Sequence, residues 1–151
     1  MASTAHTDPG RLYTLGYQGL TVDDLADWLE DFDVYVWDVR YTPYSARPEW
    51  CKAALKKRLG DRYMAAGQWF GNRNHGNPEL PMHIVRPTVG AQMLNGVLAS
   101  GKSVALMCYE RCHEDCHRAV VAGIMSGTYD VVTSHVVLVS TREHKEQPHL
   151  W

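Results

Sequence analysis

The chain has 151 residues, of which 45% are hydrophobic and 21% are charged, and its net charge is −2 with a pI of about 6.4. This length and composition suit one globular domain. The nearly neutral charge argues against a protein that grips nucleic acid through a basic surface, although a local basic patch stays possible. With no apolar run of membrane-spanning length and no signal-peptide core near the start, the sequence predicts a cytoplasmic protein with no membrane partner.

Strands and helices alternate along the first half of the chain. Residues 1–10 are small and polar and read as a flexible tail, so residues 11–151 are expected to form the domain. The elements expected next are a strand at 12–15, a helix at 22–31 capped by Thr21, a strand at 34–39, a helix from Pro48 to Leu59, and a short strand at 62–65.

The second half begins with a stretch that has no periodicity. Residues 67–87 are rich in glycine, asparagine and proline, and we expect a long loop in which residues 71–76 form a mobile lid over the site. The elements expected after it are a helix from the cap Thr88 to Ser100, a strand at 104–107, a helix from Ala119 to about Gly127, and a strand at 131–139. The end of the chain, near Leu150 and Trp151, could fold back onto the domain.

This alternation predicts a single α/β domain, a three-layer α/β/α sandwich with a mainly parallel sheet of about five strands. Polar residues follow three of the strands, at Gly16–Tyr17, at Asp38–Arg40 and at 108–118. Because the carboxyl ends of parallel strands meet at one edge, these groups should converge there. The site is expected between the strand that ends at Asp38 and the strand that ends at Cys108.

The segment 104–122 contains the highest concentration of potentially reactive side chains. It reads as a buried strand, then a polar loop with three cysteines, then a helix. Cys116 stands beside His117 and Arg118 at the helix start, where cations and free N–H groups favour a thiolate. Cys108 is a second candidate nucleophile, or else a small buried hydrophobe at the strand end.

The same segment resembles a known family. Cys108-x-Glu110 followed by Cys116-His117-Arg118 is similar to the signature of the domain-of-unknown-function 488 family. Further agreement lies at 13–17, at 37–40 with Pro43, Ser45 and Arg47, near Gly71 and at His135. The resemblance favours Glu110 as a catalytic residue and draws attention to His135, but the family's activity is not established. The layout is also loosely similar to that of rhodaneses, whose loop cysteine carries sulfur.

Three arginines suggest an anionic ligand. Arg40, Arg47 and Arg118 have the planar fork that suits phosphate, and the other residues expected to bind the ligand are Gly16, Tyr17, Tyr44 and Ser45. The first hypothesis is therefore an enzyme that cleaves a nucleotide-like or nucleic-acid-derived phosphate ligand by hydrolysis or glycosidic cleavage. Glu110 or Asp38 would handle protons and His117 would assist. Asp38 could instead be a buried partner that fixes Arg40 or His117.

Two further hypotheses remain open. One is thiol or sulfur-transfer chemistry at Cys116 or Cys108, and the other is a module that binds a nucleotide signal without turnover. A metal is not expected, although zinc is the first candidate if one binds. Cysteine and histidine are the residue types that bind zinc, and the segment offers Cys108, Cys112, His113, Cys116 and His117. Their spacing along the chain differs from that of usual zinc sites, in which the ligands come in pairs. The oligomeric state cannot be predicted from these patterns.

Overall fold

The computed structural model describes residues 8–77, 79–111 and 116–140. The strands are β1 (Leu12–Gly16), β2 (Val34–Asp38), β3 (Tyr63–Ala65), β4 (Ser103–Cys108) and β5 (Thr133–Val136). The α-helices are α1 (Val22–Phe32), α2 (Lys52–Leu59), α3 (Gly67–Phe70), α4 (Pro87–Ala99) and α5 (Arg118–Tyr129). Two short 3₁₀ helices, η1 (Pro48–Trp50) and η2 (Gly60–Arg62), flank α2.

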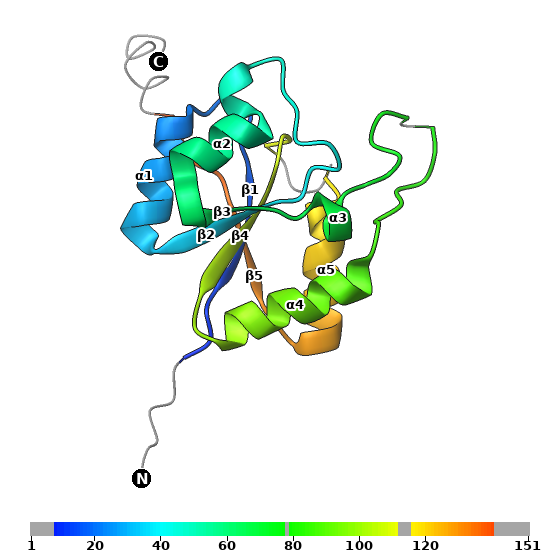
Figure 1. Cartoon of the computed structure of the whole chain (residues 1–151). Coiled ribbons are helices and arrows are strands. Elements are labelled where there is room, and N and C mark those ends of the chain that lie inside the picture. The colour runs from blue at the N-terminus through cyan, green and yellow to red at the C-terminus, as the bar shows by residue number, and fades with distance from the viewer. Residues whose placement is uncertain (1–7, 78, 112–115, 141–151) are drawn as a thin grey trace, which may run out of the picture.

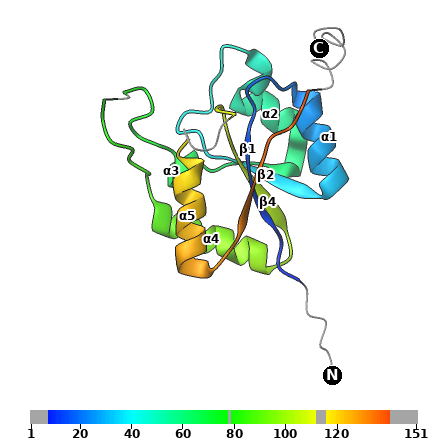
Figure 2. The same cartoon turned by 180° about the vertical axis from the view of Figure 1, so that it is seen from behind.

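The strands form one parallel sheet in the order β3-β2-β4-β1-β5. Helices α1 and α2 cover one face, and α4 and α5 cover the other (Figures 1 and 2). The chain moves toward β3 through its first two crossovers and then returns to β4 and β5, so right-handed connections place the two helix pairs on opposite faces. The predicted α/β class with its five-stranded parallel sheet is confirmed.

The strand ends are level at the carboxyl edge of the sheet. Asp38 of β2 pairs with Met107 of β4, and Gly16 of β1 pairs with Cys108. This register brings the segments that follow β1, β2 and β4 to one edge, as the alternation of strands and helices predicts.

Each face of the sheet has its own hydrophobic core. On the α1–α2 face the buried side chains include Leu25, Val36, Trp50 and Met107. On the α4–α5 face the core contains Leu94 and Met125, and Cys108 and Cys116 belong to it. Residues alternate along β4, so Met107 and Cys108 point to opposite faces.

Helix α1 has the terminus that its sequence predicts. The Thr21 side chain accepts a hydrogen bond from the backbone N–H of Asp24, and the Asp24 carboxylate accepts one from the Thr21 N–H, which completes a capping box. The helix ends at Asp33, which adopts a left-handed conformation with φ of 54°.

Several predicted boundaries were wrong. The helix expected from Pro48 to Leu59 is divided, because Cys51 has the extended angles φ −78° and ψ 153°. The N-cap of α4 is Arg86, so the proline at position 87 takes the first helical position and Thr88 lies inside the helix. Helix α5 runs on to a left-handed cap at Asp130, past the predicted stop near Gly127, and β5 is shorter than the predicted strand 131–139.

Most of the described part of the stretch 67–87 is a loop, as predicted, but it contains two ordered features. It opens with α3, and Asn72 and Ile84 then form an antiparallel bridge. The Asn72 side-chain oxygen accepts hydrogen bonds from the N–H groups of Asn74 and His83. The mobility predicted for residues 71–76 stays a prediction.

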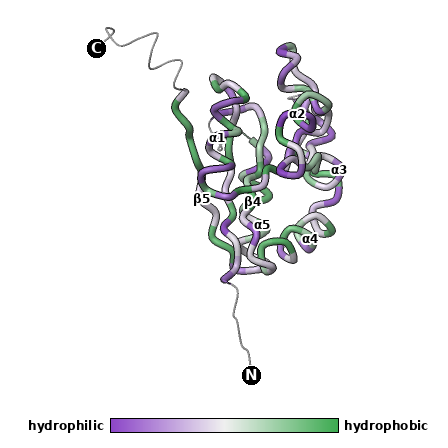
Figure 3. Tube along the Cα trace, turned by 60° about the vertical axis from the view of Figure 1, so that its left-hand side comes forward, coloured by the Kyte–Doolittle hydropathy of each residue, from purple (hydrophilic) through white to green (hydrophobic). Residues whose placement is uncertain are grey.

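Surface character differs between elements. In Figure 3 helix α2 is largely hydrophilic, since it carries Lys56, Lys57 and Arg58, whereas the segment around β5 is mostly hydrophobic. Within the described ranges, every helix is too short or too polar to traverse a lipid bilayer. The flexible tail predicted at residues 1–10 and the fold-back of the chain end lie wholly or largely outside the described residues.

Candidate functional site

The sheet has a topological switch point between β2 and β4. These neighbouring strands pair along their length, but the connection after β2 leads toward β3 and the one after β4 leads through α5 toward β5. Connections that diverge in this way leave a crevice at the carboxyl ends, where α/β proteins bind their ligands. The predicted location of the site, between Asp38 and Cys108, coincides with this point.

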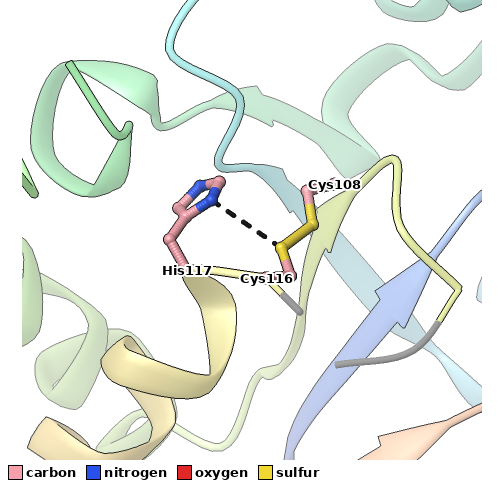
Figure 4. Close-up of side chains that lie close together, drawn as sticks. All are labelled: Cys108, Cys116 and His117. Carbon is pink, nitrogen blue, oxygen red and sulfur yellow. Dashed lines mark hydrogen bonds between the residues drawn. A yellow bond between two sulfur atoms is a disulfide. The ribbon is translucent and has the colours of Figure 1, made fainter. Parts of the chain in front are cut away.

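Two cysteines meet at the switch point. Cys108, the last residue of β4, is joined to Cys116 by a disulfide (Figure 4). Both residues are buried, with exposures of 1% and 3%. The sequence predicted each of them as a reactive residue but did not predict their pairing. Cys51 is free and lies outside this group.

Charged groups surround the Cys108 sulfur. The Nη1 atom of Arg118 donates a hydrogen bond to Cys108 Sγ at 2.8 Å and to the Glu110 carbonyl oxygen at 2.6 Å. The Glu110 carboxylate oxygen Oε2 lies 3.2 Å from the same sulfur. In the dithiol form this last contact is a hydrogen bond from S–H to carboxylate, so Cys108 has both a proton acceptor and a cation that stabilises its thiolate.

His117 faces the other sulfur. Its Nε2 atom lies 2.8 Å from the carbonyl oxygen of Val39, and its Nδ1 atom lies 3.7 Å from Cys116 Sγ. A carbonyl oxygen only accepts, so Nε2 carries the hydrogen and Nδ1 presents a lone pair to the sulfur (Figure 4). Burial lowers the pKa of His117, against the opposing effects of the Val39 carbonyl and of Glu110. The ring is therefore neutral at pH 7 and can accept a proton.

Cys108, Cys116 and His117 are also the residues that could hold a metal ion. Their three ligand atoms lie within 4.8 Å of one another. Two thiolates and a neutral imidazole suit zinc, but the sulfurs can serve as ligands only when the disulfide is open. Cys112 and His113, the other candidate ligands, lie outside the described residues.

Asp38 and Arg40 lie on the opposite face of the sheet from the cysteines. The Arg40 Nε and Nη2 atoms donate to the two Asp38 carboxylate oxygens at 2.8 and 2.6 Å. Arg40 also donates to the Tyr17 hydroxyl and the Trp50 carbonyl, and Tyr63 donates its O–H to Asp38 at 2.5 Å. Burial by itself lowers the pKa of Arg40, but the hydrogen bond and charge of Asp38 raise it overall. Asp38 thus has the second of its predicted roles, as the partner that fixes Arg40.

The other residues predicted to bind an anion are also spread over the edge. Arg47 donates to the Leu20 carbonyl and lies 3.7 Å from Glu49, and Ser45 Oγ accepts from the Arg47 N–H. Tyr44 is 71% exposed. Gly16 supports the site through its backbone, since a Cβ there would overlap the Glu110 carbonyl. His135 lies in β5 with its Nδ1 atom 2.6 Å from Thr14 Oγ1. Arg40, Arg47 and Arg118 each donate to a different internal partner, Asp38, the Leu20 carbonyl and the Glu110 carbonyl.

A pocket does open at the same edge, next to the carboxyl ends of β2 and β3. Its volume is about 630 Å³, and the residues that line it are Tyr41, Thr42, Gly67, Gln68, Trp69, Arg73, Val85 and Arg86. The sequence reading missed Arg73 and Arg86 as site residues. The signal that could have found them is the presence of two arginines, Arg73 and Arg86, within the long loop predicted at 67–87.

The chain was compared with known proteins. A model of the family described as Domain of unknown function DUF488 matches residues 21–125, more than half of the chain, and the chain belongs to this family. The matched range contains Asp38, Cys108, Cys116 and His117. The description of the family assigns no activity. Neither the curated proteins nor the solved structures contain a match to the chain.

Proposed function

We propose that the protein is a cysteine-dependent enzyme that reacts with S–S bonds, with Cys108 and Cys116 cycling between dithiol and disulfide. One observation carries the proposal: the two sulfurs are bonded to each other, and each has its own proton acceptor, His117 for Cys116 and Glu110 for Cys108. A nucleophile, a base and a group that orients the base are the usual parts of covalent catalysis. Here the Val39 carbonyl orients the base.

The first step uses Cys116. Its proton passes to Nδ1 of His117, the thiolate forms a bond to one substrate sulfur, and the substrate S–S bond breaks. The other substrate sulfur leaves as a thiolate. Attack by a thiolate on a sulfur through a mixed disulfide is the general route of such exchange.

The second step uses Cys108. Its proton passes to Glu110, and its thiolate, stabilised by Arg118, attacks Cys116 Sγ. The bond between Cys116 and the substrate sulfur breaks, and the second thiolate leaves. The two released thiolates take up the two protons, so the dithiol loses two electrons and one substrate disulfide becomes two thiols. Two molecules of a second thiol reverse the reaction: the first opens the Cys108–Cys116 bond as a mixed disulfide, the second displaces it, and the two leave as a disulfide while the dithiol is restored. A persulfide also contains an S–S bond that a thiolate can attack, so the proposal includes sulfur-transfer substrates.

The phosphate hydrolase hypothesis has less support at this place. Arg40 and Arg118 donate to internal partners on opposite faces of the sheet, so their hydrogen bonds in this structure are made within the protein. The proposal includes a cytoplasmic location for the protein, because a disulfide that opens and closes is the kind that occurs in the cytosol, where most disulfides are transient and catalytic.

The test is single-turnover reaction with dithiobis(nitrobenzoate), a disulfide that releases a coloured thiolate. The protein carries Cys51→Ser and Cys112→Ser, so that only the pair can react. We expect two thiolates per chain and a protein without adduct, because Cys108 resolves the mixed disulfide. With Cys108→Ser added, one thiolate should appear and the adduct should stay on Cys116.

The control is Cys116→Ser in the same background, which should react at least tenfold more slowly because the His117 base faces Cys116 and not Cys108. A stable adduct on both cysteines, or equal rates for the two serine variants, would contradict the proposal. A metal site would instead be favoured if the reduced protein binds one zinc per chain and does not react with dithiobis(nitrobenzoate) until a chelator removes the zinc.

A further inference from the structure

The pocket beside β2 and β3 is separate from the sulfur chemistry and has a different character. Two arginines, Arg73 and Arg86, line it, and none of its lining residues is acidic. Both arginines are exposed, and among the described residues neither forms an ion pair. The pocket therefore concentrates positive charge in a protein whose net charge is −2.

The secondary structure adds to this charge. Arg86 is the N-cap of α4, a helix of 13 residues, so the first turn of that helix begins at the pocket wall. The positive end of a helix dipole attracts anions, although the first helical residue here is Pro87, which has no N–H to donate. Two guanidinium forks and a helix N-terminus at one concave site favour a phosphate group.

The pocket also offers aromatic surface. Tyr41 is 43% exposed, and Trp69 is partly buried with its inner side packed against the core that holds Cys108 and Cys116. Thr42 and Gln68 add polar groups that can form hydrogen bonds. A volume of about 630 Å³ lies within the range of small-molecule sites. Aromatic rings stack on a planar base while cations hold an anion a short distance away.

We infer that this pocket binds a nucleoside monophosphate, with Arg73 and Arg86 on the phosphate and Tyr41 or Trp69 on the base. The site is independent of the cysteine pair, so it stands whether or not the S–S chemistry does. A nucleotide-like ligand was also expected from the sequence, but there it was assigned to Arg40, Arg47 and Arg118 and not to the residues of this pocket. The phosphate comes either from a free nucleotide or from the 5′ end of a nucleic acid.

The segment that forms the pocket also connects it to the sulfurs. Val39, whose carbonyl accepts from His117, lies two residues before Tyr41. The Tyr41 ring centroid is 6.0 Å from that of His75, and His75 is close enough to lower the pKa of His117. The pocket is therefore linked to His117 through the backbone from Val39 to Tyr41 and through His75.

The test is isothermal titration calorimetry of the full chain with AMP, GMP, CMP and UMP. Adenosine, which lacks the phosphate, and inorganic phosphate, which lacks the nucleoside, are titrated for comparison. We expect at least one monophosphate to bind at least tenfold more tightly than either part alone. Arg73→Gln and Arg86→Gln should each weaken that binding roughly tenfold, the scale of one charge-assisted hydrogen bond. At least one of Tyr41→Ala and Trp69→Ala should weaken nucleotide binding and leave phosphate binding unchanged.

The matched control is Arg11→Gln, which removes an exposed arginine just before β1, at the opposite edge of the sheet. It should bind like the unaltered chain, and Cys116→Ser should too, which separates failure of this inference from failure of the S–S chemistry. Tighter binding of a 5′-phosphorylated dinucleotide than of any monophosphate would identify a nucleic-acid end as the source. The inference is overturned if no monophosphate binds below about 1 mM, if phosphate alone binds as tightly, or if the arginine double variant binds unchanged.

Discussion

The Nε2 atom of His117 lies 2.8 Å from the carbonyl oxygen of Val39, which joins the start of α5 to the segment after β2. This contact fixes the tautomer, since the carbonyl accepts and the ring nitrogen must donate. It also aims the Nδ1 lone pair at Cys116. The proposed proton transfer from Cys116 to His117 depends on this orientation.

Replacing His117 by two different amides should separate its two roles. His117→Gln can keep a donor near the Val39 carbonyl but removes the base, so the first thiolate should be released about a hundredfold more slowly at pH 7 with little change in stability. His117→Asn is too short to reach the carbonyl and should also lower the free energy of unfolding, by about 1–3 kcal/mol. Stopped-flow absorbance and urea denaturation measure the two effects. Equal rates for His117→Gln and the unaltered chain would remove His117 from the chemistry.

Stability should fall in mild acid because of the same residue. Burial lowers the pKa of folded His117 below its ordinary 6.5, so the unfolded chain binds a proton first as the pH falls. This contribution to stability is complete above pH 6.5 and is lost as the pH falls toward the lowered value. Urea denaturation of the unaltered chain and of His117→Gln at several pH values should show a steeper loss in the former. Parallel curves would mean that His117 titrates normally.

Asp38 and Arg40 should behave as a structural pair. Asp38→Asn leaves the buried guanidinium of Arg40 without its charge partner and should cost about 3–5 kcal/mol of unfolding free energy. Its reaction with dithiobis(nitrobenzoate), measured under conditions where it is folded, should be close to normal, because Asp38 lies on the other face from the cysteines. Loss of reactivity with unchanged stability would instead support the catalytic role considered from the sequence.

Much of this arrangement could be predicted, because it follows from backbone patterns. Apolar runs and capped helices identify parallel strands, and parallel strands put Asp38 and Cys108 at one edge. Side-chain pairing could not be predicted in the same way. Arg40 bonds to Asp38 and to the Trp50 carbonyl, which only the folded connection after β2 brings near.

The pocket and the disulfide escaped prediction for related reasons. Arg73 and Arg86 lie within the segment 67–87, which has no apolar period, and they line one pocket because the Asn72–Ile84 bridge folds that segment back on itself. Three cysteines within nine residues allow several pairings, and spacing alone does not choose between them.

Gly16 should be essential to the geometry around Glu110. A Cβ at this position would overlap the Glu110 carbonyl, so Gly16→Ala should push the segment after β4 outward and lower stability by about 1–3 kcal/mol. It should also slow the second thiolate release, because Glu110 lies in this segment and Arg118 donates to the segment's carbonyls, and both contact Cys108. Gly96→Ala is the control, since a Cβ at this helical position meets no atom within 4 Å. Equal stability of the two alanine variants would count against the close approach.

The central claim is that Cys108 and Cys116 form one reversible disulfide. Differential alkylation tests it directly: the unaltered chain is equilibrated in glutathione buffers of increasing oxidation, free thiols are alkylated, and the linked peptides are identified by mass spectrometry. The account predicts that the peptides of Cys108 and Cys116 become linked to each other and are released again on return to the reducing buffer, while Cys51 stays alkylated throughout. A disulfide that joins Cys112 to either residue, or a pair that stays alkylated in every buffer, would contradict it.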